Sequence, residues 1–170
     1  MYLRIPKRQK TMEQEPILNA HNKDEHRPSH TAEHILNGTV ARLYGCGRAF
    51  SSHVERKKSK LDYHLAQPLT EEQIRDLEDR VNAVIAANVE VWTEYARKTD
   101  MAGRFDLDRL PDDASETVRI VHVGDYDECL CVGQHVERTG QIGRFRISSS
   151  RWQDGVQRLV FRLDETESHD

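Results

Sequence analysis

The chain has 170 residues, 36% of them hydrophobic, and a formal net charge of -4. This length fits one compact domain with a modest extension. The negative net charge excludes nucleic-acid binding through overall charge. No apolar run approaches the ~18 residues of a membrane span, and the N-terminus lacks a signal-peptide pattern, so we expect a cytoplasmic protein without a membrane partner. The three cysteines, Cys46, Cys129 and Cys131, are too few for a disulfide framework and remain available as reduced thiols.

The periodicity of the apolar residues predicts two helices and several strands. The helices are expected over residues 29–44 and 70–88, and the strands within 48–65 and over 89–96, 117–124, 142–150 and 155–163. Pro28 suits the first turn of the first helix, Gly45 should end that helix, and Thr70 with Gln73 has the spacing of a capping box. Helices and strands mix without strict βαβ alternation, which favours an α+β fold with helices packed on an antiparallel sheet.

Residues 26–163 are therefore predicted to form one folded domain. Residues 1–25 are polar and aperiodic, and form either a short strand with a loop or a mobile arm. Residues 97–116 are charged and irregular, which predicts a short helix and a loop. The acidic residues 164–170 are predicted to be a disordered tail.

Two pairs of candidate metal ligands stand out by their spacing. His30 and His34, in the stretch HTAEHIL, lie at i and i+4 on one face of the predicted helix. Cys131 and His135, in CVGQH, are also four residues apart, and Gly133 allows a tight turn between them. One thiolate with three imidazoles is a good ligand set for Zn²⁺. The two pairs together predict a zinc site; a buried cysteine beside a capping histidine is the alternative.

The stretch HTAEH also matches the inverted zinc-protease pattern H-x-x-E-H, in which Glu33 would be the general base. That interpretation needs a third ligand, for which Glu116 is conceivable, and it leaves Cys131 and His135 unexplained. Otherwise Glu33 is expected to face solvent on the helix, and His26 to be a surface residue ahead of it.

Several segments, taken in order, resemble the editing domain of alanyl-tRNA synthetases, its stand-alone AlaX-type relatives and the related domain of threonyl-tRNA synthetases. The segments are HTAEHIL, LDYHLAQPLTEEQIRDLEDRVNAVI, VRIVHVGDYDECLCVGQHVERTGQIGRFRI and GVQRLVFRL, from about His30 to Leu163. The resemblance implies a sheet behind a cleft that holds His30, His34, Cys131 and His135 as zinc ligands, with His30 and His34 as the catalytic pair.

The same resemblance implies an activity and a partner. The expected reaction is hydrolysis of the ester between a wrong amino acid and its tRNA, carried out in trans, with serine or glycine on alanine tRNA as the first substrates to consider. Four protein ligands would make the zinc structural, and three would leave a position open for chemistry. The sequence leaves this choice open, together with the oligomeric state.

The expected pocket departs from the family pattern at several positions. Gln134 replaces the threonine of C-G-G-T-H, Cys129 stands where an acidic residue is usual, and Ser51-Ser52 replaces a glycine-serine pair. We expect Ser52, Gly133, Gln134 and Cys129 to contact the substrate. These departures keep two alternatives open: a zinc-stabilised tRNA-binding module without turnover, and a hydrolase of another small aminoacyl ester or amide.

Local positive charge is expected to contact the tRNA, and no DNA partner is expected. One basic turn contains Arg56, Lys57, Lys58 and Lys60. Arginines at positions 144, 146, 151 and 158 could form a second basic surface. Such contacts to the phosphate backbone would be sensitive to salt; a merely solvated face is the alternative.

Overall fold

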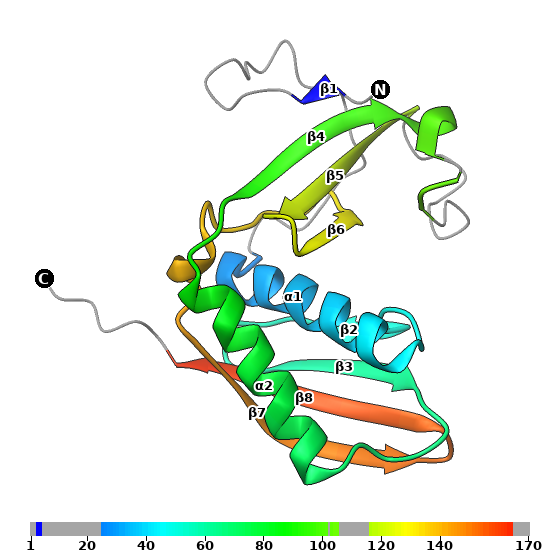
Figure 1. Ribbon diagram of the computed structural model, residues 1–170, viewed down its shortest axis with the longest axis vertical. Helices are drawn as coiled ribbons and strands as arrows, with labels where there is room; N and C mark the ends of the chain where they lie inside the picture. The colour runs from blue at the N-terminus through cyan, green and yellow to red at the C-terminus, as the bar shows by residue number, and fades with distance from the viewer. Residues whose placement is uncertain (1–2, 5–24, 102, 106–115, 165–170) are drawn as a thin grey trace, which may run out of the picture.

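The computed structural model describes residues 3–4, 25–101, 103–105 and 116–164 (Figure 1). Most of the predicted extension over 1–25, most of the predicted tail over 164–170 and part of the predicted loop over 97–116 lie outside the described residues. The helices are α1 (Arg27–Tyr44) and α2 (Glu71–Ala86), with two short 3₁₀ helices, η2 (Lys98–Met101) and η4 (Thr139–Gln141). The strands are β1 (Leu3–Arg4), β2 (Ser51–His53), β3 (Ser59–His64), β4 (Val91–Arg97), β5 (Thr117–Val123), β6 (Asp127–Leu130), β7 (Arg144–Gln153) and β8 (Val156–Asp164).

The strands form two antiparallel sheets. The upper sheet of Figure 1 has the order β1-β4-β5-β6, and the lower sheet has the order β2-β3-β8-β7. Two helices with antiparallel sheets confirm the predicted α+β class. The sequence did not predict the division into two sheets. One reason is the edge strand β6 of the upper sheet, whose four residues DECL are too short and too polar to give an alternation signal.

The ends of both helices are fixed by local hydrogen bonds. The His26 side chain accepts a hydrogen bond from the Ser29 N–H at 3.3 Å, so α1 begins two residues before its predicted start and His26 is its N-cap. Gly45, with φ 65°, ends α1 as predicted. The capping box of Thr70 and Gln73 is confirmed at the start of α2. Neither helix in the described part of the chain is long and apolar enough to span a membrane.

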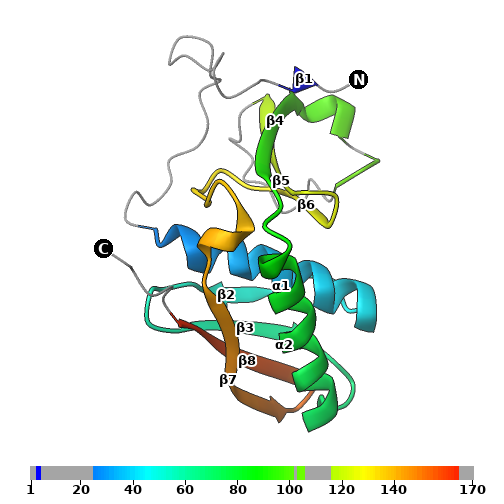
Figure 2. The ribbon, with the colours of Figure 1, turned by 60° about the vertical axis from the view of Figure 1, so that its left-hand side comes forward.

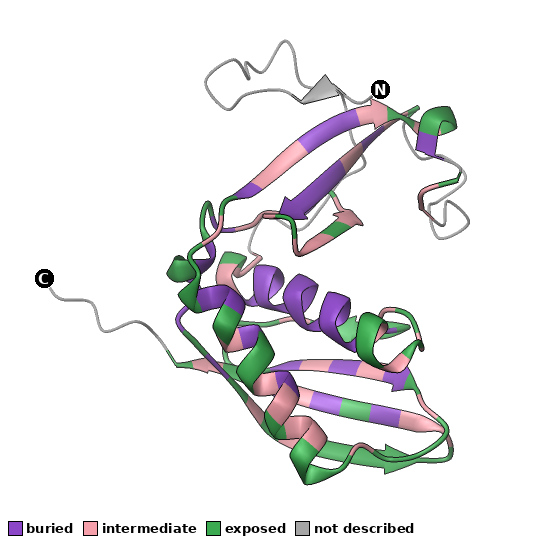
Figure 3. Ribbon diagram, in the orientation of Figure 1, coloured by how far each residue is buried: buried purple, intermediate pink, exposed green. Residues whose placement is uncertain are grey.

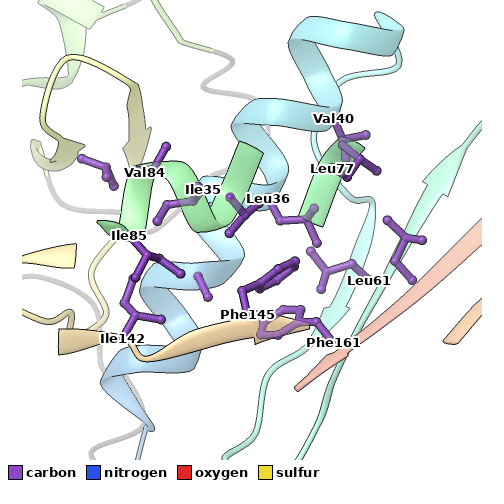
Figure 4. Packing of buried hydrophobic residues seen from close by; sticks show 14 of the residues in the cluster. Ile35, Leu36, Val40, Leu61, Leu77, Val84, Ile85, Ile142, Phe145 and Phe161 are labelled. Carbon is purple, nitrogen blue, oxygen red and sulfur yellow. The ribbon is translucent and has the colours of Figure 1, made fainter. Parts of the chain in front are cut away.

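The main core lies between the two helices and the inner face of the lower sheet (Figure 4). Its buried side chains include Ile35, Leu36, Val40, Leu61, Leu77, Val84, Ile85, Ile142, Phe145 and Phe161. The rings of Phe145 and Phe161, on neighbouring strands, lie 5.0 Å apart between centroids. This packing fixes α1 against the lower sheet by burying one apolar side of the helix.

The opposite side of α1 is also buried, as the purple colour along most of the helix shows (Figure 3). The two views place α1 between the lower sheet and the β5-β6 part of the upper sheet (Figures 1 and 2). Every residue from Ser29 to Val40 is buried, and several of these residues are polar. Buried polar groups need partners. The polar side of α1 is therefore the place to look for a functional site.

Candidate metal centre

Four side chains with metal-binding atoms converge on the polar side of α1. His30 and His34 come from α1, and Cys131 and His135 come from the loop between β6 and η4. Their ligand atoms all lie within 4.8 Å of one another. The structure thus brings together the two pairs that the sequence singled out, although they are about a hundred residues apart in the chain.

The distances within the cluster suit a single small ion. Cys131 Sγ lies 3.4 Å from His30 Nε2 and 3.7 Å from His135 Nε2. Two ligands at a tetrahedral angle around a zinc ion are roughly 3.3–3.6 Å apart. The centroid of the His34 ring lies 4.9 Å from that of His30 and 4.4 Å from that of His135. The four donors could therefore hold a metal ion.

Outer partners set the orientation of His30. Its Nδ1 lies 2.6 Å from Glu25 Oε1 and 3.0 Å from the backbone oxygen of Gln134. Both of these atoms are acceptors, so Nδ1 is the donor in these contacts. Nε2, the nitrogen that faces Cys131, is then the atom left to bind a metal. A carboxylate behind a histidine is the usual arrangement for a metal-binding imidazole.

His135 is oriented by Thr31 in the same way. The Thr31 hydroxyl donates to the Arg27 carbonyl at 3.2 Å and accepts from the Val136 N–H at 3.2 Å. It lies 2.9 Å from His135 Nδ1. Because the one hydroxyl hydrogen is used for Arg27, Nδ1 of His135 is the donor in this contact. Nε2 of His135 is therefore also the ring nitrogen available to the cluster.

His34 is the deepest of the three histidines. Its Nδ1 is buried and has no hydrogen-bond partner among the described residues. Burial, followed by the neighbouring His135 and His30, lowers the pKa of His34 well below its ordinary value. The ring is therefore neutral near pH 7, with a buried polar atom that a bound group would satisfy.

Cys131 lacks the features of a free reactive thiol. Burial raises its pKa to about 12, although its sulfur accepts a hydrogen bond from the Gly133 N–H at 3.3 Å. A coordinating cation reverses this preference, because a metal binds the thiolate. The thiol and the three imidazoles make up a donor set that fits a metal ion.

The loop that carries Cys131 and His135 fits only around a glycine. A Cβ on Gly133 would lie 2.3 Å from His30 Cε1 and 2.6 Å from Glu25 Oε1. Arg119, on β5, donates to the carbonyls of Cys131 at 3.1 Å and Gly133 at 2.6 Å. Gly133 was expected to let the backbone approach a substrate; in the structure its close neighbours are His30 and Glu25.

Sequence reasoning missed three of these supporting residues. Glu25 belongs to a polar segment without periodicity, Thr31 is one of several polar residues on α1, and Arg119 is one charge in an alternating strand. Only Arg119 could have been noticed from the sequence, because strand alternation puts it on the same side of β5 as the buried Val121 and Val123. Glu25 and Thr31 can be identified only from their contacts.

The prediction that Glu33 faces solvent is wrong. Glu33 is only 9% exposed, and its Oε1 lies 3.7 Å from His30 Nε2. Glu33 lies close enough to Arg48 and to Tyr63 of β3 to affect the pKa of both, so the side of α1 that carries it is covered. The burial of Glu33 would suit the general base of the H-x-x-E-H alternative. That alternative still lacks its third ligand, since Glu116 is exposed and lies outside the cluster.

The predicted substrate-contacting residues lie in different places. Gly133 and Gln134 belong to the metal-site loop, and the Gln134 side chain accepts a hydrogen bond from Arg27 Nε at 3.1 Å. Cys129 is half-buried on β6, opposite Val121. Ser52 is exposed on β2, and no hydrogen bond joins it to the cluster in the described part of the chain.

The predicted basic turn joins β2 to β3. Arg56, Lys57 and Lys58 are exposed there, and Lys60 lies half-buried within β3. The strand pair and its turn are confirmed by the pairing of Ser51–His53 with Lys60–Asp62. The turn is not part of the metal cluster.

Comparison with known proteins identifies relatives of this chain. Residues 118–160 match the family model described as "Threonyl and Alanyl tRNA synthetase second additional domain". The curated relatives include alanine–tRNA ligases from Halorubrum lacusprofundi (33% identical over 85% of this chain), Caldicellulosiruptor saccharolyticus (37% over 77%) and Legionella pneumophila (34% over 74%). The chain spans about 15% of the length of each. It is therefore related to the alanine–tRNA ligases over most of its length, and residues 118–160 match the synthetase domain family that its motifs resemble.

Proposed function

We propose that this chain is a zinc-dependent hydrolase that removes a wrongly attached amino acid from tRNA. Serine or glycine on alanine tRNA are the first substrates to consider. The observation that carries the proposal is the prearranged cluster: Nε2 of His30 and Nε2 of His135 face the sulfur of Cys131, and Nδ1 of the buried His34 lacks a partner among the described residues. The relationship to alanine–tRNA ligases supplies the class of substrate.

His30, His34, Cys131 and His135 would hold the zinc, with His30 and His34 as the catalytic pair. With all four bound, zinc would hold the site together; with three of them bound, its open position could polarise an ester carbonyl or lower the pKa of a water molecule. Glu25, Thr31 and Arg119 keep the ligands in position through the contacts described above. An aminoacyl ester is already labile, so a site that holds it beside a water needs little further chemistry.

The substrate pocket would be formed by Ser52, Gly133, Gln134 and Cys129. A serine substrate needs a hydrogen-bond partner for its hydroxyl, because an unpaired polar group in a pocket is a strong basis for discrimination. The side-chain oxygen of Gln134 accepts a hydrogen bond from Arg27, so the side-chain N–H groups of Gln134 remain as donors for a substrate. Ser52 would approach from the edge strand β2.

The tRNA would be a separate molecule, bound in trans in the cytoplasm. The basic turn with Arg56, Lys57, Lys58 and Lys60 is a proposed contact for its acceptor end. Arg56, Lys57 and Lys58 are exposed, so they can reach phosphates without loss of core packing.

The test is release of amino acid from a panel of charged tRNAs by the zinc-loaded chain. Serine and glycine on alanine tRNA should be released, and correctly attached alanine should be retained. Cys131→Ala should abolish zinc binding and release together. Cys46→Ala is the matched control, because Cys46 lies beyond the end of α1 and outside the cluster, and it should behave as the native chain.

A second candidate is a zinc-stabilised tRNA-binding module without turnover. It is favoured by one observation: Gln134, which departs from the family pattern, has its side chain tied to Arg27. Zinc and tRNA binding with no release from any charged tRNA would support this candidate. A hydrolase of another small aminoacyl ester or amide would instead turn over its substrate without competition from free tRNA.

A further inference from the structure

The outer face of the lower sheet is not covered by any helix that the structure describes. Both helices pack on the inner face, where Leu61, Leu159 and Phe161 belong to the core (Figures 1 and 4). Side chains alternate between the two faces of a strand, and residues paired across strands share a face. The register of the sheet therefore defines which residues lie on the open face.

That face carries an excess of positive charge. The register places on it Lys60 and Asp62 of β3, Arg158, Arg162 and Asp164 of β8, and Arg144, Arg146 and Arg151 of β7. We call this set the basic face. Six basic and two acidic side chains leave four positive charges in excess. The whole chain has a net charge of -4, so the positive face is a local feature and does not follow from composition.

Only part of this charge is neutralised within the protein. Arg158 binds Asp62 through two contacts of 2.9 and 3.0 Å, and Arg146 lies 3.3 Å from Asp164. In the described residues, no ion pair is formed by the remaining four basic residues, which are Lys60, Arg144, Arg151 and Arg162. All five arginines of the face are exposed.

The chemistry of the face suits a chain of phosphates. Arginine binds a phosphate with two parallel N–H donors, and five of the six basic residues here are arginines. Of the apolar strand residues of β3, β7 and β8, the register places only Val156 and Val160 on this face, so it lacks the buried aromatic and aliphatic anchors of a protein interface. Uncompensated positive charges repel one another in the absence of a ligand, and a polyanion removes that repulsion.

We propose that the basic face binds the phosphate backbone of the tRNA body. The choice of tRNA as the polyanion rests on the proposed function. The basic turn continues from this face at Lys60, the residue on β3 that directly follows buried Ser59. A tRNA lying along the basic face would then pass its acceptor end over the turn and round the β2 edge toward the side of the sheet that holds α1.

The experiment measures binding of uncharged alanine tRNA to the full chain as a function of salt. The test variant is Arg151→Glu with Arg162→Glu, two exposed residues without ion pairs on the face. The control variant is Arg75→Glu with Arg97→Glu, exposed residues on α2 and β4 with the same change in charge. Arg151→Gln with Arg162→Gln repeats the test without charge reversal, and circular dichroism checks that each variant is folded.

The basic face predicts a weakening of about tenfold or more at low salt for the test variant, and a fall of about two in the slope of log affinity against log salt. The control should keep the native affinity and slope. Equal losses in test and control would overturn the proposal, because they would follow net charge alone. Native-like binding by both face variants would also overturn it, as would failure of the native chain to bind tRNA.

Because uncharged tRNA is used, this result does not depend on hydrolysis. A chain that binds through the basic face but releases no amino acid supports the inference and counts against the proposed function. If the native chain and both face variants release serine at the same rate, the result supports the proposed function and counts against the basic face.

Discussion

At the scale of single residues, the metal centre depends on side chains that never touch the ion. Glu25 is the clearest case, because one carboxylate oxygen contacts both His30 Nδ1 and the Gln134 N–H, each at 2.6 Å. It therefore fixes the ring of one ligand and the loop that carries two others. Its side chain is only 13% exposed, so water competes little for these contacts.

Replacing Glu25 by glutamine should weaken zinc binding about 10- to 100-fold, the range for loss of such an outer partner. The amide can still accept from the Gln134 N–H, but it removes the negative charge behind His30. Competition with a chromophoric chelator measures the affinity. Glu72→Gln, an exposed carboxylate in the first turn of α2, is the control and should bind zinc as the native chain does. Equal affinities for all three proteins would show that Glu25 has no such role.

Gly133 gives a steric test of the same loop. Gly133→Ala should reduce zinc affinity by more than about tenfold, because the new methyl group would collide with His30 and Glu25, which are both packed in place. The loop must then move, and Cys131 and His135 must move with it. Gly103→Ala is the matched control, since a Cβ there meets nothing within 4 Å. Unchanged zinc binding by Gly133→Ala would mean that the loop can adjust without cost.

At the scale of elements, α1 is the part of the molecule on which both the core and the site depend. Its apolar side packs on the lower sheet, and its polar side holds the ligands under β5 and β6. Asn37 connects α1 to the lower sheet: its side-chain oxygen accepts from the Ala49 N–H at 2.9 Å and from the Tyr63 hydroxyl at 2.8 Å. All three residues are buried.

Asn37→Ala should therefore lower the free energy of unfolding by about 3 kcal/mol, since it leaves two buried donors unpaired. Tyr63→Phe removes only one of the donors and keeps the bond from Ala49, so its cost should be nearer 1 kcal/mol. Urea denaturation of the metal-free proteins measures both values. A cost for Asn37→Ala no larger than that of Tyr63→Phe would argue against the shared acceptor.

The elements also show what the sequence could and could not predict. Periodicity located both helices and most strands, because Ile35, Leu36, Leu77 and Val81 repeat at helical spacing and bury one side. Four-residue spacing identified both ligand pairs. The strand β6 was missed because a short polar strand gains its stability from partners that are distant in the chain. The burial of Glu33 was missed because α1 is covered on more than one side. The roles of Glu25 and Thr31 depend on the same tertiary contacts.

At the scale of the whole molecule, the metal site adds a polar link between α1 and the upper sheet, which also share the main core through Val91, Val121 and Val123. His30 and His34 are anchored in the main core through α1, and Cys131 follows directly on β6 of the upper sheet. The small second core of the upper sheet contains only Met101, Val118 and Ile120 as buried residues. A metal ion held by both parts would therefore stabilise the contact between the upper sheet and α1.

Zinc should accordingly raise the stability of the folded chain. At a free zinc concentration of 100 times Kd the gain in unfolding free energy should be about 2.7 kcal/mol, provided that the unfolded chain binds the ion weakly. Denaturation in zinc-buffered and chelator-containing solutions measures it, and hydrogen exchange at β5 and β6 locates it. Cys131→Ala should show no zinc-dependent gain, whereas Cys46→Ala should show the full gain. If zinc increased protection from hydrogen exchange only in α1, and not in β5 or β6, the ion would not join α1 to the upper sheet.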